Sequence, residues 1–427
     1  MGLLLAVAVG RPCEAEPGYV DTLAAKGLLA IPLWQARQLE AHLGQLLIIN
    51  VDGFGYSGRL ALAPGYADLV ARLQVGGVIP HYGSTDYERI ARTNRALAGM
   101  TTLPLLICSD MVKLKGPSTT ASFGDGYVGG FLGRFRSLPD AELETLARLN
   151  AFVFAAVGVN VALGPTVDGS SGDPRVIERA RLVLGQMHRY GLAPVLKHFP
   201  ALPAGADLHK ESPDTRLDLS EVQARASAFG ALSAEAGIMM TTHFYDSKVD
   251  PDIVTFSSAW IGIMRAQAGF QGLLMSDGLL MLKNYTDRRP LRGGPPARDT
   301  TGTGVDETAV WAARAIVAGH DMVILEGSAA QTTRAFNGLL ALACARTAFG
   351  RTLASRIEES YGRILQWKKA RAAALRRIVD VPASVIDQLI ALLPGSSMNL
   401  SSFRFDPAGL SRLEPALRAA AFTTAKR

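Results

Sequence analysis

Eight short, β-rich apolar runs alternate with longer helical segments from residue 45 onward, and this alternation constrains the fold more than any other feature of the sequence. The runs are Gln45–Val51, Gly76–Pro80, Leu103–Ser109, Val157–Gly164, Ala193–Leu196, Gly237–Thr241, Gly272–Ser276 and Asp321–Leu325. The intervening segments have a helical period, as in Ala141–Ala155, Arg175–Arg189 and Val222–Ala236. The pattern predicts βα units and a parallel sheet.

A polar or ionisable residue stands at or shortly after the end of every one of these runs. In chain order these residues are Asp52, His81, Asp110, Asp168, Lys197–His198, Thr242–His243, Asp277 and Glu326. In a (β/α)8 barrel the carboxyl ends of the strands converge on one face, which carries the active site. Turns also favour polar residues, but they do not explain three histidine-bearing ends. The sequence therefore predicts an α/β chain with a (β/α)8 TIM-type barrel rather than a doubly wound open sheet.

The charge and cysteine content of the chain argue against nucleic acid and zinc as partners. Lysine plus arginine (44) exceeds aspartate plus glutamate (38) by six, and this excess is scattered, without a basic stripe that carries aromatic residues. Nucleic-acid binding is therefore not expected. The three cysteines, Cys13, Cys108 and Cys344, are too few and too widely spaced for a disulfide framework or a zinc site. Cys108 and Cys344 lie in apolar runs, which predicts buried thiols.

The chain is expected to have three parts. Residues 1–15 resemble the apolar core and cleavage region of a signal peptide without its basic start, so they are a signal peptide or a short apolar arm. On this basis the expected location is periplasmic or secreted, with cytoplasmic as the alternative. Residues 16–370 form the barrel, with a long loop over its mouth at Asn284–Thr303, and residues 371–427 form a mostly helical extension with an irregular tail. No later run offers the roughly 20 apolar residues that a membrane span needs.

Two places in the sequence can supply the groups that glycoside hydrolysis needs, a nucleophile or base and a proton donor. Asp277 ends the seventh run, so it projects into the predicted barrel mouth. Asp207 and His209 follow the fifth run, and their spacing in extended backbone puts both side chains on one side. A neighbouring carboxylate fixes the histidine tautomer and stabilises its protonated form, which suits His209 to proton donation near neutral pH.

Several phrases resemble glycoside hydrolase family 3, and in particular its β-N-acetylglucosaminidase branch. They are GVNVALGPTVD at 158–168, KHFP at 197–200 followed by DLH at 207–209, MMTTH at 239–243 and GFQGLLMSD at 269–277. Shorter matches extend the resemblance to about residues 40–370, in the family's own order.

This resemblance implies a retaining exo-β-glycosidase, acting on N-acetylglucosaminides of cell-wall-type sugars and needing no metal or organic cofactor. Asp277 would form the covalent glycosyl-enzyme, and His209, paired with Asp207, would be the acid/base. Lys197 and His198 would hold sugar hydroxyls. Asp110 would bind the outer hydroxyls of the sugar.

Some alternatives stay open at this point. Lys197 either contacts the ligand or forms a structural ion pair, and His243 either contacts substrate or is a buried histidine satisfied by the backbone. The sequence departs from the family's pattern at Asp110–Gly116 and at Ala201–Ala206. A β-glucosidase or xylosidase of the same family and an inactive sugar-binding barrel are therefore the rival functions. The sugar, the acceptor (water or phosphate) and the oligomeric state are not fixed by the sequence.

Overall fold

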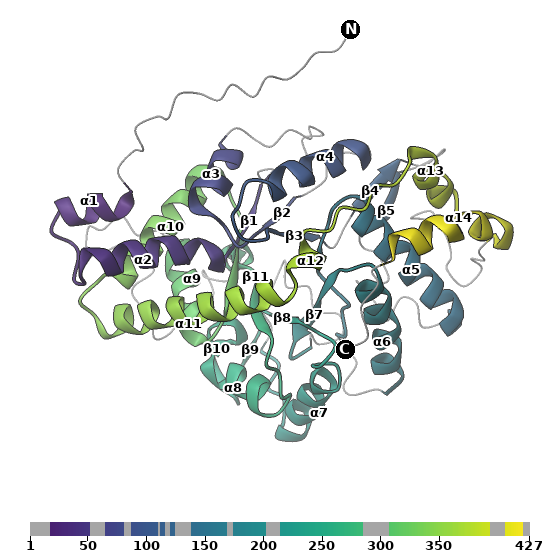
Figure 1. The fold of residues 1–427 in the computed structure, drawn as a ribbon. Helices are drawn as coiled ribbons and strands as arrows, with labels where there is room; N and C mark the ends of the chain where they lie inside the picture. Colours follow the sequence, from purple (N-terminus) through teal and green to yellow (C-terminus); the bar gives the residue numbers. More distant parts are fainter. Residues whose placement is uncertain are drawn as a thin grey trace, which may run out of the picture.

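The computed structural model describes ten segments of the chain: residues 18–51, 65–80, 87–109, 112–115, 120–123, 138–168, 174–201, 214–284, 307–392 and 406–421. Its centre is a closed barrel of parallel strands in the order β1-β12-β11-β8-β7-β6-β3-β2 (Figure 1). The strands are β1 (Leu47–Asn50), β2 (Gly77–Ile79), β3 (Leu106–Ser109), β6 (Val161–Ala162), β7 (Ala193–Phe199), β8 (Ile238–Thr241), β11 (Leu273–Gly278) and β12 (Met322–Leu325). The (β/α)8 barrel expected from the sequence is therefore confirmed.

Each barrel strand overlaps one of the eight predicted runs. The strands are almost wholly buried because they are covered on one side by helices and on the other by the barrel interior. Closure is made by β1, which pairs with β2 on one side (Ile48 with Gly77) and with β12 on the other (Ile48 with Ile324). Strand β6 is only two residues long, shorter than its predicted run.

A helix follows each barrel strand and covers the outside of the barrel, as Figure 1 shows. In chain order these are α3 (Tyr66–Leu73), α4 (Tyr87–Ala98), α5 (Asp140–Ala156), α6 (Pro174–Arg189), α7 (Leu219–Gly230), α8 (Ser258–Ala266), α9 (Glu307–Ala318) and α10 (Ala329–Ala343). Local sequence fixes some of their starts. Asp218 and Glu221 form a capping box at α7, and Ser328 and Gln331 form one at α10.

The remaining elements lie outside this repeat. Helices α1 (Tyr19–Ala25) and α2 (Leu33–Leu43) precede the short 3-10 helix η1 (Gly44–Leu46), which leads into β1. Two antiparallel pairs follow barrel strands: β4 (Val112–Lys115) with β5 (Thr120–Phe123), and β9 (Tyr245–Asp246) with β10 (Asp250–Ile253). The 3-10 helix η3 (Val254–Phe256) follows β10 and comes before α8. Neither pair was predicted from the sequence.

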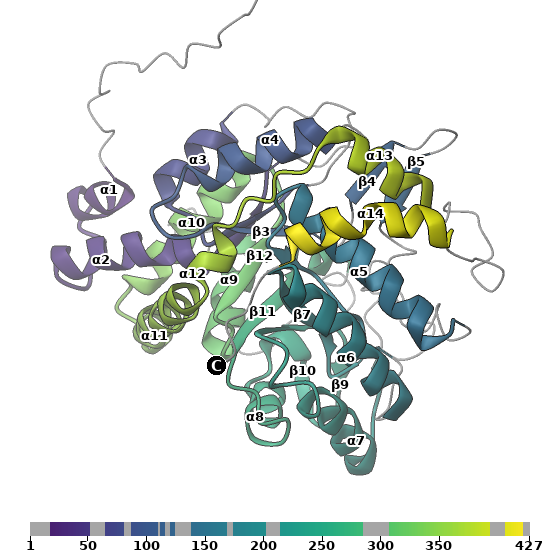
Figure 2. The same cartoon turned by 45° about the vertical axis from the view of Figure 1, so that its right-hand side comes forward.

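The described residues of the C-terminal part are mostly helical, and the prediction of an irregular tail was wrong for residues 407–420. Helix α11 (Ala348–Ala370) is followed by α12 (Ala372–Leu375), α13 (Ala383–Leu392) and α14 (Pro407–Ala420). Helix α14 packs against α5, as Figure 2 shows, with an ion pair of 3.1 Å between Arg148 and Glu414. Asp406 caps the helix and Pro407 occupies its first position. The extension thus lies on the outside of the barrel.

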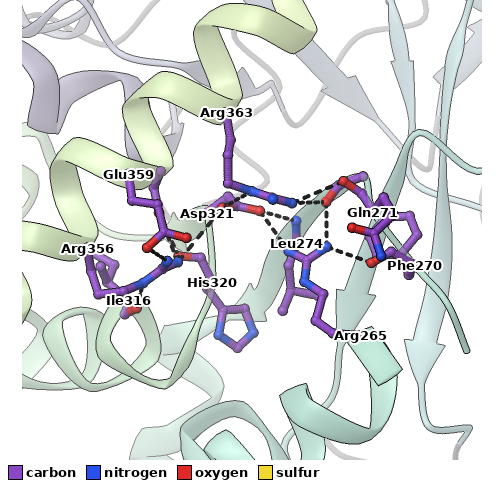
Figure 3. A network of polar contacts seen from close by, with 12 residues as sticks. Arg265, Phe270, Gln271, Leu274, Ile316, His320, Asp321, Arg356, Glu359 and Arg363 are labelled. Atoms are coloured by element: carbon purple, nitrogen blue, oxygen red, sulfur yellow. Dashed lines mark hydrogen bonds and ion pairs between the residues drawn. The ribbon is translucent and has the colours of Figure 1, made fainter. Parts of the chain in front are cut away.

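A buried carboxylate joins α11 to the amino-terminal ends of the strands (Figure 3). Asp321, just before β12, has no exposed surface and accepts hydrogen bonds from the Leu274 amide (2.9 Å), Arg363 Nε (3.0 Å) and Arg265 Nη2 (3.2 Å). The same two arginines donate to the Gly272 carbonyl. This end of the barrel is therefore built for stability, which leaves the opposite end for chemistry.

Close backbone contacts and a buried amine complete the base of the barrel. Lys368 of α11 is fully buried, and its Nζ donates to the Gly76 carbonyl (2.7 Å) and to Gln45 Oε1 (2.9 Å). A Cβ at Gly76 would run into the carbonyl oxygen of Gln45, so only glycine fits there. Burial lowers the pKa of Lys368 to about 7, and nearby Cys108 opposes the shift. Cys108 and Cys344 are both buried free thiols, as predicted.

Candidate active site

The carboxyl ends of neighbouring strands bring predicted site residues together. Asp168 follows β6, Lys197 and His198 lie in β7, and Asp277 lies in β11. His198 stands between the two aspartates: its Nδ1 is 2.7 Å from Asp168 Oδ2 and its Nε2 is 3.9 Å from Asp277 Oδ2. The His198 amide also donates to Asp168 Oδ1 (3.2 Å). These residues form one acid–histidine–acid row, and the part of Asp168 in it was not predicted.

The Asp168 carboxylate fixes the orientation of the His198 ring. Because a carboxylate accepts hydrogen bonds, the short contact places a proton on Nδ1 and leaves Nε2 facing Asp277 and the barrel mouth. The His198 side chain is 17% exposed and that of Asp277 is 21% exposed. Both groups are therefore accessible from the mouth while their backbones stay in the barrel wall.

Asp277 is held in its ionised form. Burial by itself would raise the pKa of this carboxyl. His198, His243 and Lys197 and the Gly278 amide, which donates to Oδ1 at 2.8 Å, outweigh burial, so the pKa of Asp277 lies below its ordinary value. An ionised carboxylate at the end of a barrel strand can act as a nucleophile or a base.

Lys197 is 8% exposed and acts on Asp277 electrostatically. Its backbone pairs with the segment after β6 through an isolated bridge to Thr166. A basic side chain in this position offsets the negative charge of Asp277. The contact between Lys197 and the ligand stays a prediction. The electrostatic effect of Lys197 on Asp277 is separate from that contact.

His243 lies behind Asp277 rather than in the open mouth. Its ring has no exposed surface, its Nδ1 is 2.7 Å from Thr255 Oγ1, and its Nε2 is 3.0 Å from the Gly278 carbonyl oxygen. The ring is thus buried among protein partners, and the substrate contact expected for His243 stays a prediction. A direct contact with substrate would require both protein contacts to be replaced.

Glu326 is a site residue that the sequence left unassigned. It follows β12, the strand that pairs with β11. Its carboxylate lies against Gly278, where an added Cβ would meet the Glu326 oxygens at 2.6 and 2.9 Å. The position of Glu326 after the eighth strand could have indicated a residue near the site. An acidic residue in that position is, however, also an ordinary turn residue.

The predicted acid/base pair Asp207–His209 and the predicted sugar ligand Asp110 lie outside the described residues. So do residues 1–15, Cys13, and all of the predicted mouth loop except Asn284.

The structure describes both ends of the segment that carries Asp207 and His209. At one end the Ala201 amide donates to the His198 carbonyl (2.6 Å), and Arg225 donates to the Ala201 carbonyl (2.6 Å). At the other end the buried Asp246 carboxylate accepts from the Thr215 hydroxyl (2.7 Å) and the Leu217 amide (2.8 Å). The segment therefore starts three residues after His198, and the chain is next described where it pairs with β9, at the bridge between Asp214 and Tyr245.

Within the described part of the chain, no group of three or more histidine, cysteine, aspartate or glutamate residues is arranged to hold a metal ion. No helix in that part is long and apolar enough to cross a membrane.

Comparison with known proteins places the chain among the glycosidases. The profile of the Glycosyl hydrolase family 3 N terminal domain matches residues 38–366. A beta-hexosaminidase of Xanthomonas oryzae pv. oryzae is 26% identical over 268 residues, which cover 56% of this chain and 77% of that protein.

Solved structures share the fold. A glycoside hydrolase family 3 beta-N-acetylglucosaminidase from Paenibacillus sp. superposes with a TM-score of 0.64 at 20% identity, covering 88% of this chain and 68% of that one. A beta-N-acetylhexosaminidase from Beutenbergia cavernae gives a TM-score of 0.58 at 22% identity, over 78% of this chain and 98% of that one.

Proposed function

Because the chain belongs to glycoside hydrolase family 3, and so is a glycosidase acting on a carbohydrate, we propose that it is a retaining exo-β-N-acetylglucosaminidase with Asp277 as its nucleophile. The observation that carries the proposal is the ionised Asp277 at the end of β11, surrounded by His198, His243 and Lys197. A retaining glycosidase needs such a carboxylate next to the anomeric carbon. The hexosaminidase relatives support the choice of sugar, and cell-wall fragments are the substrates we propose to test.

In the first step an Asp277 carboxylate oxygen attacks the anomeric carbon, and the bond to the leaving oxygen breaks as that oxygen receives a proton. In the second step water attacks the same carbon, gives up a proton, and releases the sugar and the free Asp277 carboxylate. His209, assisted by Asp207, is the group we propose for both proton transfers. Near neutral pH a histidine can both donate and accept the proton.

His198 has a separate part in this proposal. With Nδ1 held by Asp168, its Nε2 is presented at the mouth beside Asp277. In that place it can bind a hydroxyl of the sugar that Asp277 attacks, and Lys197 can bind another. Their contact with substrate places the sugar ring over the nucleophile and contributes to orientation.

The test is the release of nitrophenol from a panel of nitrophenyl β-glycosides by the wild-type protein, Asp277→Ala and Asp68→Ala. Asp68 is a carboxylate on α3 whose side chain is 81% exposed, so it serves as the matched control. We expect turnover of the N-acetylglucosaminide, a loss of about 10³-fold or more in kcat/KM for Asp277→Ala, and wild-type activity for Asp68→Ala.

The other outcomes of the panel identify the rival functions. Preference for a glucoside or xyloside would keep the mechanism and overturn the sugar specificity. Binding of sugars without turnover of any glycoside by the wild-type protein would make the chain an inactive sugar-binding barrel.

A further inference from the structure

The hydrogen bonds around His243 determine the charge of its ring. The ring Nε2 lies 3.0 Å from the Gly278 carbonyl oxygen. A carbonyl oxygen can only accept a hydrogen bond, so Nε2 carries a proton.

The second ring nitrogen also faces an acceptor. The Thr255 hydroxyl, 2.7 Å from Nδ1, donates its single proton to the Thr242 carbonyl, also at 2.7 Å. In this arrangement Thr255 Oγ1 accepts from His243, so we infer that Nδ1 carries a proton as well. An imidazole with protons on both nitrogens is an imidazolium.

His320, a neighbouring buried histidine, shows the opposite arrangement. Its Nδ1 donates to the Ala315 carbonyl (2.9 Å), whereas its Nε2 lies 2.8 Å from the Thr241 hydroxyl, which can donate to it. The neutral ring thus satisfies both contacts, and burial lowers the pKa of His320 to about 3. Burial alone therefore does not produce the pattern seen at His243.

The charges around His243 can balance an imidazolium. Asp277 brings negative charge to the Gly278 side of the ring, where its electrostatic contact with His243 is favourable, and the Glu326 carboxyl group lies against the same glycine. Lys197 and His198, in the adjacent strand β7, and His320, next to β12, are the basic groups nearby. Of these, His320 is neutral.

The ring is also connected to the nucleophile through the backbone. His243 donates to the carbonyl of Gly278, and the amide of the same glycine donates to Asp277 Oδ1 at 2.8 Å. One residue thus lies between the histidine and the carboxylate. The Gly278 carbonyl is therefore fixed by His243, and the amide of the same residue holds the Asp277 carboxylate.

We propose that His243 is a positioning residue for Asp277: a buried imidazolium that holds the Asp277–Gly278 segment through the Gly278 carbonyl and provides positive charge next to the carboxylate. Its effect on catalysis rests on the proposed function, since it acts through the nucleophile. The charge state of the His243 ring does not rest on the proposed function, and it can be measured without any substrate.

The first measurement is ¹⁵N NMR of the histidine rings in the full chain, with the His243 signals assigned by their loss in His243→Gln. The chain has seven histidines, and His320 serves as an internal standard for a neutral ring. We expect both His243 nitrogens to be of the protonated type at neutral pH, and one nitrogen of His320 to be unprotonated. An unprotonated nitrogen in His243 would overturn the proposal.

The second measurement is the pH profile of kcat/KM for the wild-type protein and His243→Gln, which keeps a donor but removes the charge. Loss of an adjacent positive charge should move the acid limb upward by about one pH unit or more, with a smaller change in KM. An acid limb at the wild-type pH would overturn the proposal. If His243→Gln fails to fold, Thr255→Val removes the acceptor of Nδ1 and should move the limb in the same direction.

The two proposals can fail separately. If the wild-type protein turns over no glycoside, the proposed function fails, and ¹³C NMR titration of the Asp277 carboxyl replaces the kinetic profile. The same upward shift in His243→Gln is then expected, and its absence would overturn the part proposed for His243.

Discussion

Replacing Asp168 by asparagine tests the acid–histidine–acid row directly. Asp168 makes two hydrogen bonds to His198, one at 3.2 Å from the backbone amide and one at 2.7 Å with Nδ1. In Asp168→Asn the amide oxygen can still accept from the backbone, but the short bond to a charged acceptor is lost.

The size of the effect follows from that one bond. A hydrogen bond to a charged group contributes about 1.5–3 kcal/mol, which corresponds to a fall of about 10- to 150-fold in kcat/KM. Because His198 would orient the sugar and does not react with it, we expect the loss to be shared between kcat and KM. The assay is hydrolysis of the nitrophenyl glycoside that the wild-type protein prefers, with thermal unfolding measured in parallel.

The matched control is Glu414→Gln, which makes the same chemical change in a part-buried ion pair with Arg148 on the outside of the barrel. It should leave kcat/KM at the wild-type value. A kcat/KM for Asp168→Asn within twofold of wild type would refute the reasoning, as would a loss that is fully explained by unfolded protein.

Three further predictions concern the base of the barrel. Lys368 has a folded pKa of about 7 against an ordinary value of 10.5, so between these pH values the unfolded chain binds a proton that the folded chain lacks. The free energy of unfolding of the wild-type protein, measured by denaturant titration, should therefore rise with pH in this range. The rise should be absent in Lys368→Met and present in Lys369→Met, which changes the exposed neighbour. Gly76→Ala puts a Cβ onto a backbone carbonyl and should destabilise the fold by about 1–3 kcal/mol. Gly262→Ala, in a helix with open space around the added carbon, should leave the melting temperature unchanged or raise it. Similar melting temperatures for the two variants would show that Gly76 is not held against the Gln45 carbonyl. Asp321→Asn leaves part-exposed arginines without their carboxylate and should cost about 2–3 kcal/mol of unfolding free energy with kcat unchanged in the folded fraction, whereas wild-type stability would show that the network is not structural.

The strands, and the face of the barrel on which their carboxyl ends meet, were predictable because they depend on residues that are close together in the sequence. A buried parallel strand needs a short apolar run, and the barrel directs the residues at its carboxyl end to one face. The pattern placed Lys197, His198 and Asp277 on this face and the structure has them there, while their parts in catalysis stay predictions. The eight runs differ in boundaries from the strands by a few residues, as at β6.

The features that were missed depend on contacts between distant parts of the chain. Asp168 lies 30 residues from His198, and no local pattern pairs them. His243 is polar and ends a strand, so the sequence cannot distinguish a residue in the mouth from one whose partners Thr255 and Gly278 bury it. The hairpin of β4 and β5 has the sequences VKLK and TASF, which are too short and too polar to indicate a strand pair.

Trapping of the glycosyl-enzyme is the most direct test of Asp277 as the nucleophile. The protein would be incubated with a fluorinated N-acetylglucosaminyl fluoride, which forms the intermediate faster than it hydrolyses, then digested and analysed by mass spectrometry. We expect one sugar adduct per chain, on the Asp277 carboxylate, and no adduct in Asp277→Ala. An adduct on another residue, or turnover of the normal substrate with inversion at the anomeric carbon, would contradict this role of Asp277.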